Sequence, residues 1–158
     1  MGVEAASTPT VRCAERADLL AVLRIEKQSF PQPWTYDAFE RFLGETGFLI
    51  ADVAGTDTPV VGYVVADTIQ NHGGPLGHVK DIAVHPDHRE RGIGTRLLRA
   101  ALDRLAGQGA SAVKLEVRAS NDTATTLYED FGFEVHHTVP EYYADGEDAR
   151  VMVRQLTG

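Results

Sequence analysis

The chain has 158 residues, of which 43% are hydrophobic and 24% charged, the balance of an ordinary globular protein with one sizeable core. Its 15 Lys and Arg against 23 Asp and Glu give a formal net charge of −8, which argues against a nucleic-acid partner bound through a basic surface. No apolar run approaches the ~20 residues of a membrane span, and the start of the chain lacks a signal-peptide pattern. We therefore expect a cytoplasmic protein without membrane contact, with a disordered tail at residues 1–8 and a single domain at 9–158.

The first half of the chain predicts three strands and two helices, with strands at 10–14, 48–53 and 60–67 and helices at 18–30 and 36–43. Asp18 can cap the first helix through its side chain, and Pro31 ends that helix. The single cysteine, Cys13, excludes an internal disulfide. Its place in the first strand favours a small buried thiol over a nucleophile.

The second half predicts four strands and two helices, with strands at 77–84, 112–117, 133–138 and 149–156 and helices at 92–106 and 121–131. The strand at 112–117 alternates strictly, so that its apolar side chains share one face and its charged side chains, Glu116 among them, share the other. The complete order, βααβββαβαββ, predicts a mixed α/β sheet.

A glycine-containing loop precedes the helix at 92–106, with the sequence Arg89-Glu90-Arg91-Gly92-Ile93-Gly94-Thr95. The first turn of a helix leaves backbone N–H groups unpaired at its positive end, and glycines let a phosphate approach the backbone closely. The chain has no Gly-Lys-Ser/Thr triplet for a Walker loop, and the third glycine of a dinucleotide fingerprint is missing. On the glycines alone, a turn that merely allows tight packing explains the segment equally well.

The surroundings of this loop, Ile82 to Gly94, resemble the acetyl-CoA motif of the GCN5-related N-acetyltransferase (GNAT) superfamily, in which Arg or Gln is followed by x-x-G-x-G/A. Three further blocks look like the Nα-acetyltransferase branch: Leu115-Glu116-Val117-Arg118-Ala119-Ser120-Asn121, Leu127-Tyr128-Glu129-Asp130-Phe131-Gly132-Phe133 and Tyr142-Tyr143-Ala144-Asp145-Gly146-Glu147-Asp148-Ala149. The segment Ser29-Phe30-Pro31-Gln32-Pro33-Trp34 resembles the ribosomal-protein-alanine (RimI-like) type. The resemblance covers nearly the whole chain and implies the GNAT fold, an α/β (α+β) fold with four helices. Its sheet has about seven mostly antiparallel strands and splays between the fourth and the fifth.

The same resemblance implies acetyl-CoA as cosubstrate and assigns its binding residues, which are Ile82, Ala83, Val84, Arg89, Glu90, Arg91, Gly92, Ile93, Gly94, Thr95 and Asn121. In such enzymes the strand edge at Ile82 and Val84 pairs with the pantetheine arm, and the Val84 N–H polarises the thioester carbonyl. Amides of the loop hold the pyrophosphate, and Asn121 contacts the pantetheine. Glu90 departs from the family pattern, because an acid beside a pyrophosphate costs energy unless its side chain points away.

Acetyl transfer to an amine requires a neutral amine, a stabilised oxyanion and a protonated leaving thiolate. The resemblance assigns these tasks to Glu116 as base and Tyr128 as acid, with His78 as a second base. A glutamate near its ordinary pKa of about 4.3 is a weak base, so Glu116 acts through water, acquires a raised pKa in the groove, or mainly orients the amine. The non-catalytic alternatives are a solvated charge for Glu116, a core tyrosine for Tyr128 and a solvent-facing histidine for His78.

Phe30, Pro31, Tyr142 and Tyr143 line, by resemblance, the slot for a peptide N-terminus, and otherwise form an aromatic cluster at one end of the sheet. We expect no metal, because the adjacent His136 and His137 should point to opposite sides of their strand.

The favoured function is acetylation of a protein α-amine, with the N-terminal alanine of a ribosomal protein as one candidate acceptor and a direct attack in a ternary complex. The alternatives are an acetyltransferase for a lysine side chain or a small amine, and a non-catalytic acyl-CoA-binding module. The expected oligomeric state is a monomer or a weak homodimer.

Overall fold

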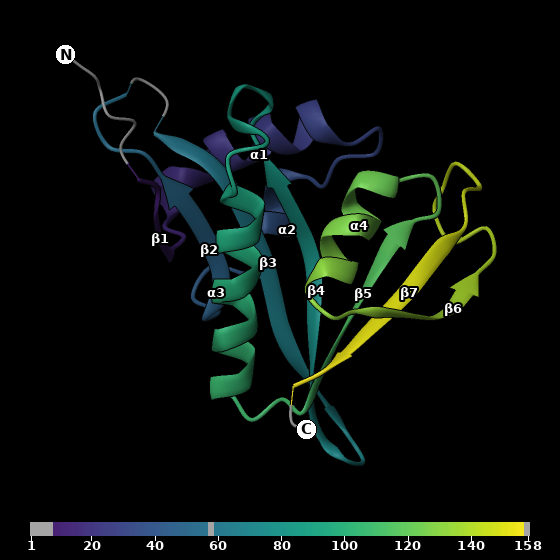
Figure 1. The fold of residues 1–158 in the computed structure, drawn as a ribbon. Coiled ribbons are helices and arrows are strands. Elements are labelled where there is room, and N and C mark those ends of the chain that lie inside the picture. The colour runs from purple at the N-terminus through teal and green to yellow at the C-terminus, as the bar shows by residue number, and fades with distance from the viewer. Residues whose placement is uncertain (1–7, 57–58, 157–158) are drawn as a thin grey trace. The chain divides into compact units, whose positions relative to one another are not determined.

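The computed structural model describes residues 8–56 and 59–156 (Figure 1), so nearly all of the expected tail lies outside the described residues. Seven strands are hydrogen-bonded in the order β1-β2-β3-β4-β5-β7-β6, and β4 and β5 are parallel. The strands are β1 (Thr10–Cys13), β2 (Gly47–Asp52), β3 (Val60–Asn71), β4 (Gly74–Val84), β5 (Ala112–Arg118), β6 (Glu134–Val139) and β7 (Ala149–Gln155). The α-helices are α1 (Leu19–Ser29), α2 (Tyr36–Glu40), α3 (Ile93–Gly107) and α4 (Asp122–Asp130). The predicted seven-stranded mixed sheet with four helices is confirmed.

The chain forms two compact units, and each is described by itself. The first unit comprises the described residues within 1–66 and 81–101, and the second those within 67–80 and 102–158. β3, β4 and α3 run from one unit into the other. No helix in the described part of the chain has the length and apolar character needed to cross a membrane.

In the first unit, helices cover both faces of β2 and β3 (Figure 1). Residues that are paired across antiparallel strands share a face, as Ile50 does with its partner Tyr63, and both belong to the core cluster formed with α1 and α2. On the opposite face, an added Cβ at Gly62 would lie 3.0 Å from Leu97 Cδ1 and 3.3 Å from Ile93 Cγ2 of α3. The missing side chain therefore allows α3 to lie directly on the sheet.

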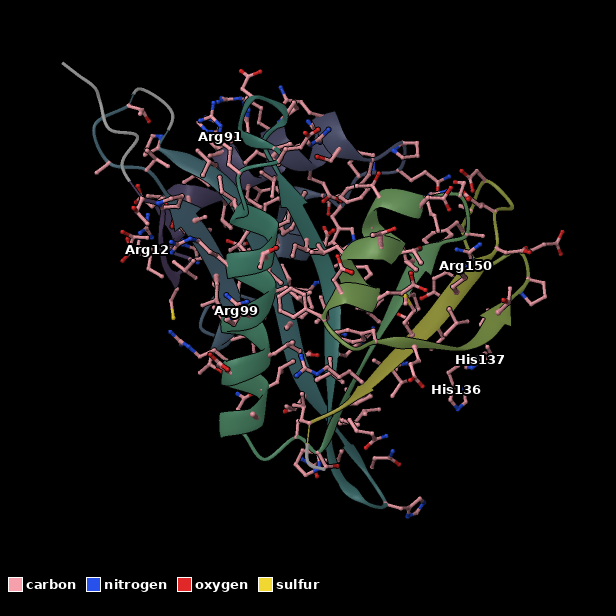
Figure 2. All side chains as sticks on the ribbon, viewed as in Figure 1. Arg12, Arg91, Arg99, His136, His137 and Arg150 are labelled. Atoms are coloured by element: carbon pink, nitrogen blue, oxygen red, sulfur yellow. The ribbon has the colours of Figure 1, made fainter. Side chains whose placement is uncertain are left out.

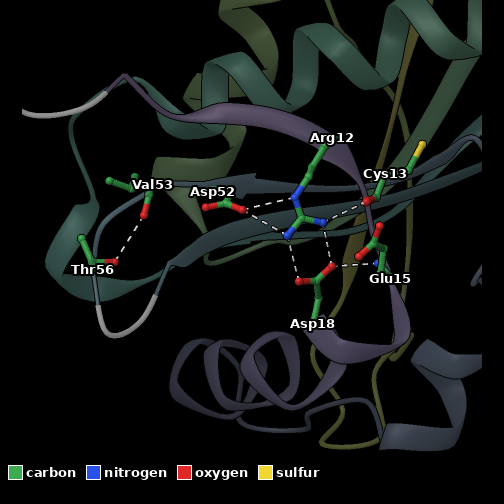
Figure 3. A network of polar contacts seen from close by, with 7 residues as sticks. All are labelled: Arg12, Cys13, Glu15, Asp18, Asp52, Val53 and Thr56. Atoms are coloured by element: carbon green, nitrogen blue, oxygen red, sulfur yellow. Dashed lines mark hydrogen bonds and ion pairs between the residues drawn. The ribbon is translucent and has the colours of Figure 1, made fainter.

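An arginine ties the start of this unit together (Figure 3). The Arg12 guanidinium donates to both carboxylate oxygens of Asp18, at 2.9 and 3.0 Å, and to Asp52 Oδ2 of β2. Asp18 is the N-cap residue of α1, as predicted, but its side chain makes no capping hydrogen bond because Arg12 and the Glu15 amide occupy its oxygens. Burial works to raise the pKa of Asp18, but these bonds and the Arg12 charge lower it below its ordinary value.

In the second unit, β5 pairs with β7 along its whole length, and its parallel pairing with β4 covers three residues, from Gly77↔Val113 to Val79↔Leu115. The predicted alternation of β5 is confirmed, since Val113, Leu115 and Val117 are all buried. The charged face of the same strand is half-buried rather than solvated.

Two local predictions are wrong. Cys13 is exposed on the edge strand β1 rather than buried. His136 and His137 do not point to opposite sides, because the register between β6 and β7 shifts between Val135 and His137. Their Nδ1 atoms are 2.7 Å apart, and Figure 2 marks both imidazoles on β6. Among the described residues, no three His, Cys, Asp or Glu side chains are grouped to hold a metal ion.

Candidate active site

The glycine loop has an unusual backbone at two of its residues. Gly92 has a φ of 77° and Glu90 a φ of 63°, both in the left-handed region that side chains other than glycine seldom adopt. Glu90 is exposed, and α3 begins directly after Gly92, at the buried Ile93. The first N–H groups of α3 lack partners within the helix, so the loop presents backbone donors at the helix's positive end.

The arginine that opens the motif is used inside the protein. Arg89 donates from Nε to the carbonyl of Val84 at 3.1 Å and from Nη2 to Ser29 Oγ at 3.3 Å. Ser29 in turn donates to the Ile25 carbonyl of α1. Arg89 therefore fixes the glycine loop to the end of β4, while Arg91 lies on the exposed turn before α3 (Figure 2). Of the remaining predicted cosubstrate residues on β4, Ala83 is buried and Ile82 half-buried.

The two predicted bases form a pair in the second unit. His78 Nε2 lies 2.6 Å from Glu116 Oε1, and the side chains are only 16% and 12% exposed. His78 on β4 is in register with Lys114 of β5, two residues before Glu116. The strand pairing thus holds the pair in place. Neither residue is the solvent-facing side chain that the non-catalytic alternative requires.

Lysines complete the partners of this pair. Lys114 Nζ lies 3.3 Å from Glu116 Oε2, and Lys80 Nζ lies 3.2 Å from His78 Nδ1. Burial works to raise the pKa of Glu116, but the hydrogen bond with His78 and the charge of Lys114 lower it, and this pKa lies below its ordinary value. This direction is opposite to the raised pKa that was one of the three possibilities for Glu116.

The predicted acid and the predicted pantetheine contact both belong to α4. Tyr128 is 6% exposed, and its ring packs edge-on against Phe133 with centroids 5.9 Å apart. Asn121 caps α4, since its Oδ1 accepts from the Ala124 amide at 3.1 Å. The structure gives each residue a structural task, and it does not test their assigned chemical roles.

The loop between β6 and β7 carries the two tyrosines, whose rings are perpendicular with centroids 5.0 Å apart. Tyr142 is 49% exposed, whereas Tyr143 lies under the Arg118 guanidinium, 4.1 Å from its ring centroid. Arg118 also binds Asp145 and Glu147, each at 2.9 Å. The loop is therefore fastened to the end of β5, two residues from Glu116.

A buried carboxylate fastens the segment after α1, where Phe30 is half-buried and Pro31 exposed. Glu26 is 1% exposed; its Oε2 accepts from the Trp34 amide at 2.8 Å, and its Oε1 accepts from the Tyr63 hydroxyl. Sequence reasoning did not single out Glu26. The helical spacing from Leu19 and Val22 was a usable signal, because it places Glu26 on the apolar face of α1.

Asp81 lies beside this carboxylate in the first unit. Burial raises its pKa well above the ordinary value, and the hydrogen bond and charge of Glu26 raise it further. Its Oδ2 is buried without a hydrogen-bond partner, which a neutral carboxyl tolerates better than a charged one. Nothing in the local sequence of β4 indicated this pairing.

The chain matches the Acetyltransferase (GNAT) family over residues 19–133, which places it in the class of acetyl-transferring enzymes. The protein belongs to this family and is an acetyl-CoA-dependent N-acetyltransferase. It is 36% identical to the N-alpha-acetyltransferase of Saccharolobus solfataricus, over 93% of each chain. It is 33% identical to the ribosomal protein bS18-alanine N-acetyltransferase of Escherichia coli, over 94% of this chain and 98% of the other. The crystal structure of Ard1 from Thermoplasma volcanium superposes with a TM-score of 0.85 at 29% identity, covering 96% of this chain and 99% of the other.

Proposed function

We propose that the protein transfers the acetyl group of acetyl-CoA to the α-amine of a protein N-terminus by direct attack in a ternary complex. The observation that carries the proposal is the half-buried His78–Glu116 pair next to the tyrosine loop. Burial raises the pKa of Tyr142, and the charge of Glu116 raises it further. The Glu116 carboxylate and the tyrosine loop therefore share one environment. Relatives at 33% and 36% identity are named for N-terminal acetylation.

The chemistry also favours an α-amine over a lysine side chain. An α-amine with a pKa of about 8 costs ~1.4 kcal/mol to neutralise at pH 7, whereas a lysine near 10.4 costs ~4.6 kcal/mol. The difference of ~3.2 kcal/mol corresponds to about 200-fold in rate before any contact is counted. A site whose carboxylate has a lowered pKa suits an amine that loses its first proton easily.

We assign acetyl-CoA binding to the glycine loop and to the end of β4. The left-handed backbone at Gly92 and the start of α3 support a pyrophosphate held by the amides from Glu90 to Thr95. No heavy atom lies within 4 Å of a Cβ built on Gly92, which leaves room for a phosphate beside the backbone. In the first unit, the backbone from Ile82 to Val84 takes the pantetheine arm, and the bound thioester supplies the acetyl group. Asn121 of the second unit stays a predicted contact.

The chain's own groups then act on the acceptor. As the amine nitrogen bonds to the thioester carbon and the carbon–sulfur bond breaks, one proton leaves nitrogen and one is needed by sulfur. Glu116, with its lowered pKa, orients the amine and receives that proton through water rather than holding it firmly. Tyr128 supplies the proton to the thiolate. Phe30 and Pro31, and separately Tyr142 and Tyr143, make the acceptor contacts.

One experiment tests the proposal directly. A peptide with an internal lysine is offered in two forms, with a free and with a blocked N-terminus, and fragmentation locates the acetyl group. We expect labelling of the free α-amine alone. Equal labelling of the lysine in the blocked peptide overturns the proposal and favours the lysine or small-amine alternative. A panel that begins with the N-terminal alanine of a ribosomal protein tests that finer assignment, and size-exclusion chromatography tests the predicted monomer or weak homodimer.

A further inference from the structure

The His78–Glu116 pair belongs to a row of alternating charges across three strands of the second unit. In order, the row comprises Asp67 of β3, Lys80 and His78 of β4, and Glu116 and Lys114 of β5, so that the histidine stands between one oppositely charged pair and the other. Residues two apart on a strand share a face, which explains why both lysines stand beside the pair. Tyr142 and Tyr143, from the loop between β6 and β7, are further titratable groups whose pKa values the charge of Glu116 raises.

Both ring nitrogens of His78 have partners, and those partners have opposite requirements. A lysine ammonium has three donors and no acceptor, so Lys80 Nζ, 3.2 Å from Nδ1, must donate to a lone pair there. Glu116 Oε1, 2.6 Å from Nε2, is an acceptor and requires a proton on Nε2. Only the Nε2–H tautomer satisfies both contacts.

Lys80 is itself held in place. Its Nζ lies 3.6 Å from Asp67 Oδ1, within ion-pair distance and beyond a hydrogen bond. That Asp67 oxygen is buried and has no hydrogen-bond partner, so the ammonium is the charge that compensates it. The lysine side chain is 22% exposed, which limits the freedom of its ammonium to leave His78.

We propose that Lys80 is a positioning residue, which keeps a second proton off Nδ1 of His78 and so makes the histidine a neutral donor that orients Glu116 rather than a second base. In this state Nε2 already carries a proton and the Nδ1 lone pair faces an ammonium, so His78 has no site for the proton of the acceptor amine. That proton passes to Glu116 or its water. The inference deepens the proposed function and rests on it for its catalytic consequence only.

Three variants separate the role of Lys80 from that of charge in general. Lys80→Met removes both the donor and the charge, Lys80→Arg keeps both, and Lys114→Met removes an equal charge from Glu116 without touching His78. The readout is the protonation of the two ring nitrogens of His78 in the free protein at neutral pH, from long-range 1H–15N correlation spectra assigned with His78→Gln. We expect the neutral Nε2–H form in the wild type, in Lys80→Arg and in Lys114→Met. In Lys80→Met we expect a fraction of His78 with protons on both ring nitrogens, because Glu116 still accepts from Nε2 while no ammonium opposes a proton on Nδ1.

The catalytic consequence is measured separately, with acetyl-CoA and the free peptide described above. In Lys80→Met we expect kcat to fall by less than the roughly 10²-fold typical of a lost base, with an unchanged KM for acetyl-CoA and recovery in Lys80→Arg. An Nδ1–H signal for wild-type His78, which needs no variant to fold, overturns the inference. The absence of any proton on Nδ1 of His78 in Lys80→Met also overturns it. If the peptide is not acetylated at all, the proposed function fails while the protonation of His78 still decides the role of Lys80.

Discussion

Glu26 and Glu116 each have a partner at both carboxylate oxygens, yet the two side chains serve different purposes. Glu26, in the first unit, is 1% exposed and is bound by an amide and a phenol, which do not change protonation near neutral pH. Glu116, in the second unit, has a 12% exposed side chain, and its partners are a histidine and a lysine. Asp81 also lies beside Glu26, but of the two glutamates only Glu116 has basic side chains as partners.

The difference teaches how to separate structural from chemical carboxylates. Removing Glu26 leaves the Trp34 amide and the Tyr63 hydroxyl without their acceptor, so its loss should appear in the free energy of unfolding. Removing Glu116 leaves partners that reach some solvent, so its loss should appear mainly in turnover.

The largest effect on stability is expected for Glu26→Ala. The change leaves the Trp34 amide and the Tyr63 hydroxyl buried without an acceptor, at about 1–3 kcal/mol each, so we expect a loss of about 3 kcal/mol. Urea denaturation measures it. Gln28→Ala, an exposed change on the same helix, is the control and should stay within about 0.5 kcal/mol of the wild type. A loss no greater than that of the control would show that Glu26 is not structural.

The next effect is on the reaction. We expect Glu116→Gln to lower turnover roughly 10²-fold and Tyr128→Phe to lower it less, because transfer from phenol to thiolate is weakly driven. The free energy of unfolding should change less than in Glu26→Ala. Steady-state rates with the free peptide, together with urea denaturation, measure both quantities. Unchanged turnover in both variants with an intact fold would make Glu116 a structural charge and Tyr128 a core residue.

A smaller, pH-dependent effect is expected for Asp81→Asn. Since burial and Glu26 raise the pKa of Asp81 in the folded protein, its contribution to stability is fully present below the unfolded pKa of about 3.9 and is lost as pH rises through the folded pKa. Asparagine does not ionise. The variant should therefore gain stability relative to the wild type as pH rises from 4 to 8, as thermal or urea unfolding at each pH will show. A difference that is constant with pH contradicts the raised pKa.

The smallest effect is expected at the tyrosine loop. Arg118→Met removes the ion pairs to Asp145 and Glu147 and the cation over Tyr143, and we expect at most about 1 kcal/mol of lost stability. The KM for the peptide should rise several-fold while the KM for acetyl-CoA stays constant. Arg118→Lys keeps the charge but not the planar stack, so its KM for the peptide should lie between those of the wild type and of Arg118→Met. Equal changes in both KM values would mean that Arg118 acts on the whole unit rather than on the loop.

The sequence by itself determined the features that local patterns encode. Hydrophobic periodicity placed all seven strands and all four α-helices, with errors of a few residues at their ends. Glycine and charge patterns located the loop before α3, and the alternation of β5 placed Glu116 on the face opposite the buried valines. The roles assigned to the site residues, and the single domain expected at 9–158, stay predictions.

Only the tertiary structure decided which polar groups meet. The hydroxyl that binds Glu26 comes from Tyr63, 37 residues away, and the carboxylate that binds His78 is 38 residues away. The contact of Lys80 with Asp67 depends on the neighbouring strand β3, and its contact with His78 matters because Glu116 of β5 holds the other side of that ring. The register shift in β6, which turned His136 and His137 toward one another, depends on pairing with β7. Burial and partnership arise from contacts between distant segments, so a periodicity that reports one element at a time does not contain them.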